Sequence, residues 1–150
     1  MRLSDDDREW LSRETAAVLD QLPPTAARNP YQELLTAVDQ GEVPDDLLEP
    51  LSRLLAVGLE SGRIRKLYSA HAEMAAVRLY ARTPAGKAAA EAVARVNEAL
   101  ADLAGATLHR IACEARAPGS QTLVLETDRG VITLLFDRQG VRVHSAEVAG

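Results

Sequence analysis

The hydrophobic period of the chain changes once, near residue 106, and this change limits the folds available to it. Over residues 1–105 apolar side chains recur every three or four positions, which predicts amphipathic helices. Over residues 106–150 apolar and polar side chains alternate between the turns Pro118-Gly119, Arg129-Gly130 and Gln139-Gly140. The order predicts an α+β fold: about five N-terminal helices followed by a C-terminal three- or four-stranded antiparallel β-meander.

Prolines, glycines and capping residues divide the first 105 residues into helices. Ser4 and three aspartates cap the first helix, and Pro23-Pro24 ends it. The later helices are predicted over 29–40, a leucine-rich stretch at 47–59, Arg63 to about Arg82, and 84–103 after Thr83. The core-facing residues expected on the last helix are Ala89, Ala92, Val93, Val96, Leu100 and Leu103.

The spacing of the turns predicts which strand residues face the core. With two-residue loops at both later hairpins, one face carries Leu123, Leu125, Ile132, Leu134, Phe136, Val141 and Val143. A three-residue turn with a glycine bulge would shift this register, so the pairing stays open. The last helix is the natural cover for this face, and Cys113 is expected to be buried on the inward side of the first strand, within 107–116.

We expect one α+β domain over residues 1–150, with a helical part at 1–105 and an antiparallel sheet at 106–150 packed on the last helix. No stretch is rich enough in Ser, Gly or Pro to be a flexible linker. Because a small open sheet has edges that need a cover or a partner, homodimerisation is expected through a sheet edge or through the alanine-rich last helix.

Charge is distributed unevenly along the chain. Residues 1–62 carry 5 Lys/Arg and 13 Asp/Glu, whereas residues 63–150 carry 12 and 9. The acidic front and the basic middle could attract each other within one chain or across two, and the basic segment 63–87 could bind a polyanion. The overall acidic balance makes nucleic acid the weaker alternative. The 17 basic residues include only two lysines, which is typical of a GC-rich genome and suggests a bacterial source.

Candidate binding residues cluster in the basic segment. On one continuous helix over 63–82, His71, Arg78 and Arg82 would lie in a column with Ile64 on the apolar face. This column could line a pocket, with an arginine for an anionic group and the histidine moving a proton. Alternatively, His71 is a core residue with a backbone partner, and Arg78 pairs with an acid or extends to the rim. The candidate binding residues are Arg63, Arg65, Lys66, His71, Arg78, Arg82 and Lys87.

Sequence patterns for catalysis, metals and cofactors are weak. The single cysteine excludes a disulfide framework and a four-cysteine zinc site, and His71-Ala72-Glu73 lacks the paired cysteines of a zinc deaminase. The stretch Thr83 to Lys87 lacks the glycine spacing of a P-loop. We expect no catalytic residue, metal or cofactor. An acidic start and the absence of a long apolar run indicate no export signal and no membrane span, hence a cytoplasmic protein.

The favoured function is a non-catalytic protein-interaction or assembly module, such as an adaptor, a regulatory subunit or a neutralising partner of another protein. One alternative is a small ligand-binding domain or enzyme with a pocket lined by His71, Arg78 and Arg82. A second alternative is binding of nucleic acid or another polyanion through 63–87.

Overall fold

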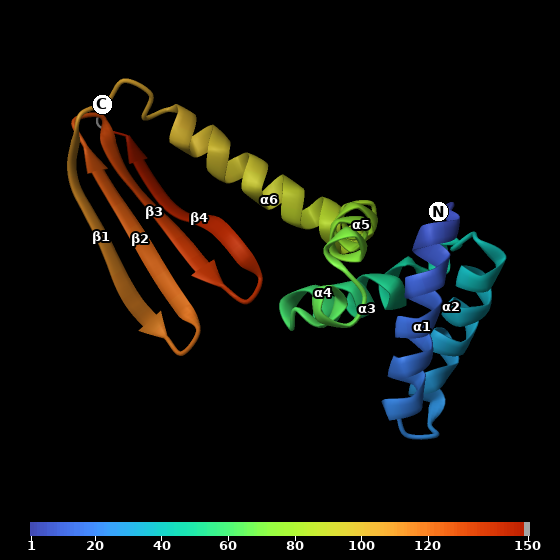
Figure 1. Ribbon diagram of the computed structural model, residues 1–150. Helices are drawn as coiled ribbons and strands as arrows, with labels where there is room; N and C mark the ends of the chain where they lie inside the picture. Colours follow the sequence, from blue (N-terminus) through green and yellow to red (C-terminus); the bar gives the residue numbers. More distant parts are fainter. Residues whose placement is uncertain (149–150) are drawn as a thin grey trace. The chain divides into compact units, whose positions relative to one another are not determined.

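The computed structural model describes residues 1–148 and shows an α+β arrangement, as the sequence predicts. Helices precede a four-stranded antiparallel sheet with strand order β1-β2-β3-β4 (Figure 1). The chain forms two compact units, Met1–Lys87 and Ala88–Gly150. The expectation of a single domain stays a prediction. The helices are α1 (Asp5–Gln21), α2 (Asn29–Gln40), α3 (Leu48–Glu60), α4 (Arg63–Leu67), α5 (Ala70–Ala81) and α6 (Pro84–Ala101), with short 3-10 turns at Ala26–Arg28 and Asp45–Leu47.

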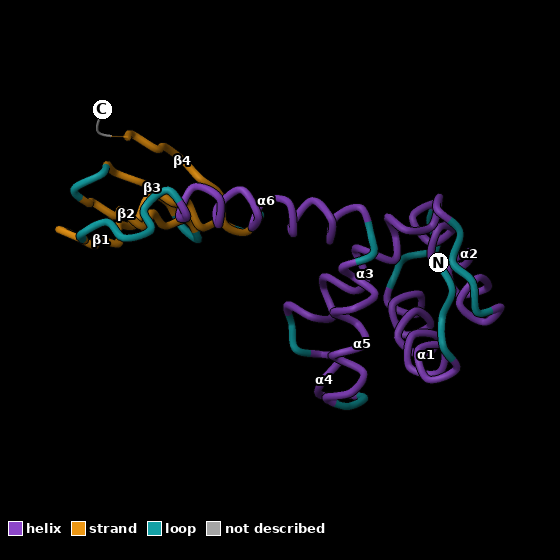
Figure 2. The backbone as a smooth tube through the Cα atoms, turned by 90° about the horizontal axis from the view of Figure 1, so that it is seen from above, coloured by secondary structure: helices purple, strands orange, loops and turns teal. Residues whose placement is uncertain are grey.

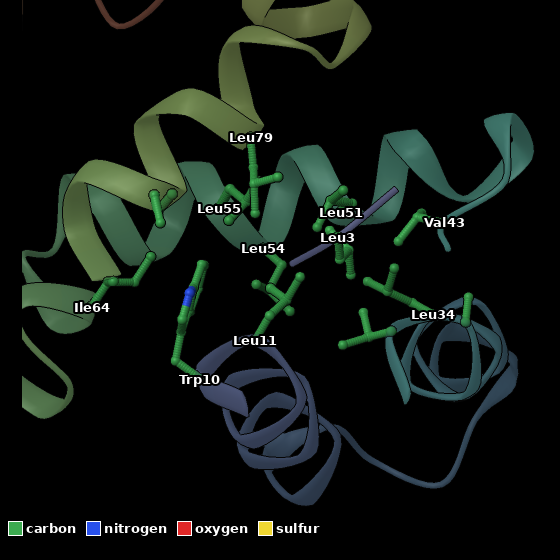
Figure 3. Close-up of a cluster of buried hydrophobic side chains, with 14 of the residues drawn as sticks. Leu3, Trp10, Leu11, Leu34, Val43, Leu51, Leu54, Leu55, Ile64 and Leu79 are labelled. Carbon is green, nitrogen blue, oxygen red and sulfur yellow. The ribbon is translucent and has the colours of Figure 1, made fainter. Parts of the chain in front are cut away.

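The first unit is built around the leucine-rich face of α3. Leu51 and Leu55 are fully buried and share one cluster with Leu11 of α1, Leu34 of α2 and Ile64 of α4 (Figure 3). The cluster also includes the alanines and Leu79 on the inner face of α5, while Trp10 closes it on the side of α1. Apolar residues three or four positions apart on each helix therefore produce one continuous core.

The predicted helix over 63–82 is in fact two helices, α4 and α5. The chain is extended at Ser69, and its Oγ accepts a hydrogen bond from the Ala72 backbone N–H at 3.0 Å, so Ser69 caps α5. Helix α4 ends at Leu67, and the side chain of Tyr68, which follows it, turns toward α1. Because the break changes the helical phase, residues after Ser69 do not lie on the same face as Ile64.

The second unit contains the meander: β1 (Leu108–Ala117), β2 (Ser120–Thr127), β3 (Gly130–Asp137) and β4 (Gly140–Val148). The last two hairpins have two-residue loops, since Thr127 pairs with Gly130 and Asp137 pairs with Gly140. This confirms the predicted register of β2, β3 and the start of β4. The expected burial is wrong at the end of β3: Phe136 is 40% exposed, because the residues that pack with α6 do not include it, whereas Leu135 on the opposite face is 6% exposed. A bulge then shifts the pairing of β3 with β4 between Thr133 and Leu134.

Helix α6 covers one part of the sheet and leaves another part open. Its C-terminal half lies against the sheet (Figure 2). There Val96 is in one cluster with Ile132 and Leu134, and residues of β2 and β4 pack against the same cluster. Three expectations are wrong here. Ala89 is exposed and Val93 is 45% exposed, because only the later residues of α6, from Val96 on, pack on the sheet. Cys113 is exposed, because the residues that pack with α6 include none from β1.

Among the described residues, no helix has both the length and the apolar character needed to cross a lipid bilayer.

Val96 and Val93 test the packing of α6, since they lie three residues apart and differ in burial. Val96 is 5% exposed, so Val96→Ala should lower the free energy of unfolding by about 2 kcal/mol through lost burial and a cavity. Val93→Ala should change it by less than about 0.5 kcal/mol. Urea denaturation of both variants measures the difference, and equal losses would contradict this packing.

Candidate interaction surface

A buried carboxylate on α1 fixes the position of α4. Glu14 is 2% exposed, and its Oε1 lies 2.9 Å from Nε of Arg63, the first residue of α4. The Tyr68 hydroxyl, immediately after α4, donates a hydrogen bond to Glu14 Oε2 at 2.9 Å. Both ends of this five-residue helix therefore bind one carboxylate, and two donors offset the cost of removing that charge from water.

This cluster changes the acidity of the tyrosine. Burial raises the pKa of Tyr68 to about 12, and the hydrogen bond to the Glu14 carboxylate acts in the same direction. The tyrosine therefore stays protonated as a donor over the whole physiological range. Glu14 is a residue that the sequence reasoning missed, although its position three residues after Leu11 and four before Val18 places it on the apolar face of α1.

Helix α5 carries apolar side chains on both its inner and its outer face. Ala72, Ala75, Ala76 and Leu79 are buried against the core. Met74 and Val77 lie on the opposite face, 62% and 53% exposed. Ala70 and Ala81 are exposed at helical spacing beside them, and we call these four residues the outer stripe of α5. Large apolar side chains gathered on an exposed helix face are typical of a docking surface.

One flank of the outer stripe is basic. His71, Arg78 and Arg82 fall within about 40° of one another around the helix axis. The predicted column therefore exists, but its placement on the apolar face is wrong: all three side chains are exposed, because the break at Ser69 rotates α5 relative to α4. Within residues 1–148 neither Arg78 nor Arg82 makes an ion pair. We call His71, Arg78 and Arg82 the basic flank.

The other predicted binding residues divide into paired and unpaired cations. Arg63 binds Glu14, and the exposed Arg65 lies 3.4 Å from Glu73. Lys66 and Lys87 are exposed and form no ion pair with any described residue. The structure brings Arg78 and Arg82 together on one helix, whereas Arg63 belongs to the buried cluster.

The N-terminus of α6 is capped by a side chain of this protein. Thr83 is fully buried, and its Oγ1 accepts the Gly86 N–H at 3.2 Å and donates to the Tyr80 carbonyl at 2.7 Å. A Cβ on Gly86 would lie 2.0 Å from that carbonyl oxygen, so only glycine fits. One backbone N–H that could bind an anion is therefore already used for capping.

A small cavity lies between the start of α1 and the segment joining α4 to α5. It measures about 260 Å³, and its lining includes Trp10, Tyr68 and His71, together with Arg13 and the acids Asp6 and Glu9. Arg78 and Arg82 do not line it, so the structure does not assemble the predicted three-residue pocket there. The Trp10 Nε1 is buried without a hydrogen-bond acceptor among the described residues.

A second cavity, of about 470 Å³, opens between α1, α2 and α3. Its apolar lining includes Val18, Tyr31 and Leu54, and Val57 stands exposed at its side. The sequence analysis did not predict this cavity. No periodic pattern could have revealed it, because Val57 lies off the leucine stripe of α3.

The described residues hold no group of three or more His, Cys, Asp or Glu side chains placed to bind a metal ion. Comparisons of the chain with protein-family models, curated proteins and solved structures find no match.

Tyr68→Phe tests the buried cluster and its dependence on pH. Removing the hydroxyl takes one donor from a buried carboxylate and should lower the free energy of unfolding by about 1.5–3 kcal/mol. The folded-state pKa is raised from 10.0 to about 12, so the unfolded chain releases this proton first. Wild-type stability that is fully present below pH 10 should therefore fall between about pH 10 and 12.

The phenylalanine variant should lack this part of the decline, as measured by urea denaturation at several pH values. Tyr31→Phe is the matched control, because Tyr31 is also half-buried in the first unit and its hydroxyl makes no side-chain hydrogen bond among the described residues. Parallel pH profiles for wild type and Tyr68→Phe would contradict the role of the cluster.

Proposed function

We propose that this chain is a non-catalytic protein-interaction module, and that α5 is its docking element. The supporting observation is the exposed pair Met74 and Val77 beside Arg78 and Arg82, two arginines that form no ion pair within residues 1–148. A partner segment that covers this surface needs an apolar face for the outer stripe and acidic side chains for the basic flank. An acidic amphipathic helix of another protein has this chemistry.

Three features favour a protein over nucleic acid at this surface. The centre of the surface is apolar, whereas phosphate groups need only the cations. The chain has a formal net charge of -5, opposite to the usual charge of a nucleic-acid-binding domain. Leu67 adds a third large exposed apolar side chain at the end of α4. We place the function in the cytoplasm, in agreement with the sequence-based expectation.

Val77→Asp tests this proposal, and Val57→Asp on α3 is its matched control. Both valines are exposed on helices of the first unit, 53% and 65%, so neither substitution should unfold it. A partner captured from the native host's cytosolic extract by the wild-type chain should then be titrated in purified form. Val77→Asp should weaken its binding at least about tenfold, since a buried apolar contact becomes a charge facing acids.

A double variant, Arg78→Glu/Arg82→Glu, should weaken the same binding and remove its dependence on salt. Three results would overturn the proposal. The first is a partner that is lost with Val57→Asp but kept with Val77→Asp. The second is capture of nucleic acid that responds to the arginine variant only. The third is the absence of any partner that distinguishes Val77→Asp from wild type.

The cavity beside His71 supports a second candidate function, binding of a small anion. Arg13 supplies a positive group and His71 a ring N–H donor beside the acids Asp6 and Glu9, of which Glu9 lies 3.4 Å from Arg13. The Trp10 Nε1 lacks an acceptor among the described residues. Trp10 is the single tryptophan, so titration with inorganic phosphate or acetate should change its fluorescence in a saturable way. His71→Ala should weaken the effect, whereas His144→Ala in β4 should not. A flat signal for both anions would end this candidate.

A further inference from the structure

Strand β1 forms an unpaired edge of the sheet with an uncovered apolar side. It lies at one end of the strand order, next to β2 alone (Figure 1). Ile111 is 60% exposed and Cys113 is exposed, and their β2 partners Leu125 and Leu123 lie on the face that α6 packs against. An edge of this kind is open to pairing with another strand.

Of the two edges, β1 is the better suited to pairing. Its register against β2 is regular from Arg110 to Ala115, so its outer edge is straight over these six residues. The other edge strand, β4, is interrupted near its middle by the bulge opposite Thr133 and Leu134. A bulge twists the strand and disrupts a continuous ladder of hydrogen bonds.

We propose that β1 pairs with β1 of a second copy of this chain, antiparallel, about a two-fold axis at Ala112. Charge and the length of the regular segment together select this register, since an axis at Ala115 would pair Glu114 with Arg116 but leave Arg110 to Ala112 without a partner in the second copy. With the axis at Ala112, Arg110 lies opposite Glu114 of the second copy, and Glu114 lies opposite its Arg110. By symmetry the dimer contains this oppositely charged pair twice. On the other face, Ile111 lies opposite Cys113 of the second copy.

The neighbouring registers lose this match. Antiparallel partners must lie on the same face of the sheet, so the axis can move only to another residue and not between residues. An axis at Cys113 places Glu114 opposite Ala112 and Arg110 opposite Arg116. An axis at Ile111 places Arg110 opposite Ala112. Neither pairs an arginine with a glutamate.

The charges of the single chain are consistent with this arrangement. Arg110 already lies 2.9 Å from Glu126 of β2, which holds its side chain on the polar face of the sheet. Glu114 on the same face makes no ion pair with any described residue. The second copy supplies the cation that Glu114 lacks, and pairing joins two four-stranded sheets into one of eight strands.

Charge reversal of the full chain tests the edge and its register. Sedimentation equilibrium of the wild type should show a concentration-dependent dimer. Glu114→Arg should raise the dimer dissociation constant about tenfold or more, because two arginine pairs then face each other. The triple variant Arg110→Glu/Glu114→Arg/Glu126→Arg reverses these three charges, keeps the pairing within each copy, and should restore dimerisation. Glu147→Arg on the β4 edge is the matched control and should leave it unchanged.

Cysteine cross-linking measures the register directly. Residues at the axis lie about 4.5–5.5 Å apart between Cα atoms, within disulfide range. In the variant Ala112→Cys/Cys113→Ser, mild oxidation should therefore produce a covalent dimer on non-reducing gels. The two wild-type Cys113 residues are diagonal neighbours about 7–8 Å apart and should not cross-link.

Each contrary result overturns a defined part of the proposal. A chain that stays monomeric at all concentrations, or a dimer that is lost with Glu147→Arg but kept with Glu114→Arg, excludes the β1 edge. Cross-linking through Cys113 but not through the introduced cysteine excludes the axis at Ala112. None of these measurements depends on α5, so the proposal stands or fails independently of the docking surface there.

Discussion

The carboxylate of Glu14 is the constraint on which the arrangement of the first unit depends. A buried charge is costly unless donors surround it, and here the donors are Arg63 and Tyr68, at the two ends of α4. A helix of five residues has no stability of its own. The shared carboxylate holds it against α1 and thereby sets the point at which Ser69 begins α5. The start of α5 in turn determines which way its outer stripe faces.

Both units leave apolar surface exposed for a similar physical reason. In each unit the packing between elements buries only part of the apolar surface that those elements carry. Helix α6 packs on β2, β3 and β4, and the apolar side of β1 stays exposed at Ile111. In the first unit the core takes the alanine side of α5, and Met74 remains outside. Both surfaces carry charged residues at their borders, and charged borders give a contact its specificity and orientation.

The sequence predicts the sheet better than the helices, and the reason is geometric. Two-residue loops and alternating side chains leave a hairpin one register, so the pairing of β2 with β3 could be predicted. Alternation does not show where the cover ends, and Phe136, expected in the core, is 40% exposed. Helical periodicity does not reveal a break such as the one at Ser69. The pattern continues past this serine, although its side chain caps a new helix. On α6 small alanines occur on several faces, so the pattern could not separate Val93 from Val96. Alternation also predicts which face of the sheet Cys113 lies on. It does not predict that the helix on that face reaches only β2, β3 and β4 and leaves Cys113 exposed.

The distribution of ion pairs indicates that the uneven charge of the first unit contributes little to holding that unit together. If the acidic residues 1–62 and the basic residues 63–87 of the same unit existed to hold that unit together, many ion pairs would join them. Among the described residues the pair of Glu14 and Arg63 alone does so, while Arg65 finds its acid nearby at Glu73. Exposed pairs contribute little to stability in any case. Unpaired cations gathered beside apolar side chains create a positive potential that attracts a complementary acidic surface and orients it. The charge of α5 is therefore not explained by ion pairing within the first unit, and it is the charge that the proposed docking of an acidic partner requires.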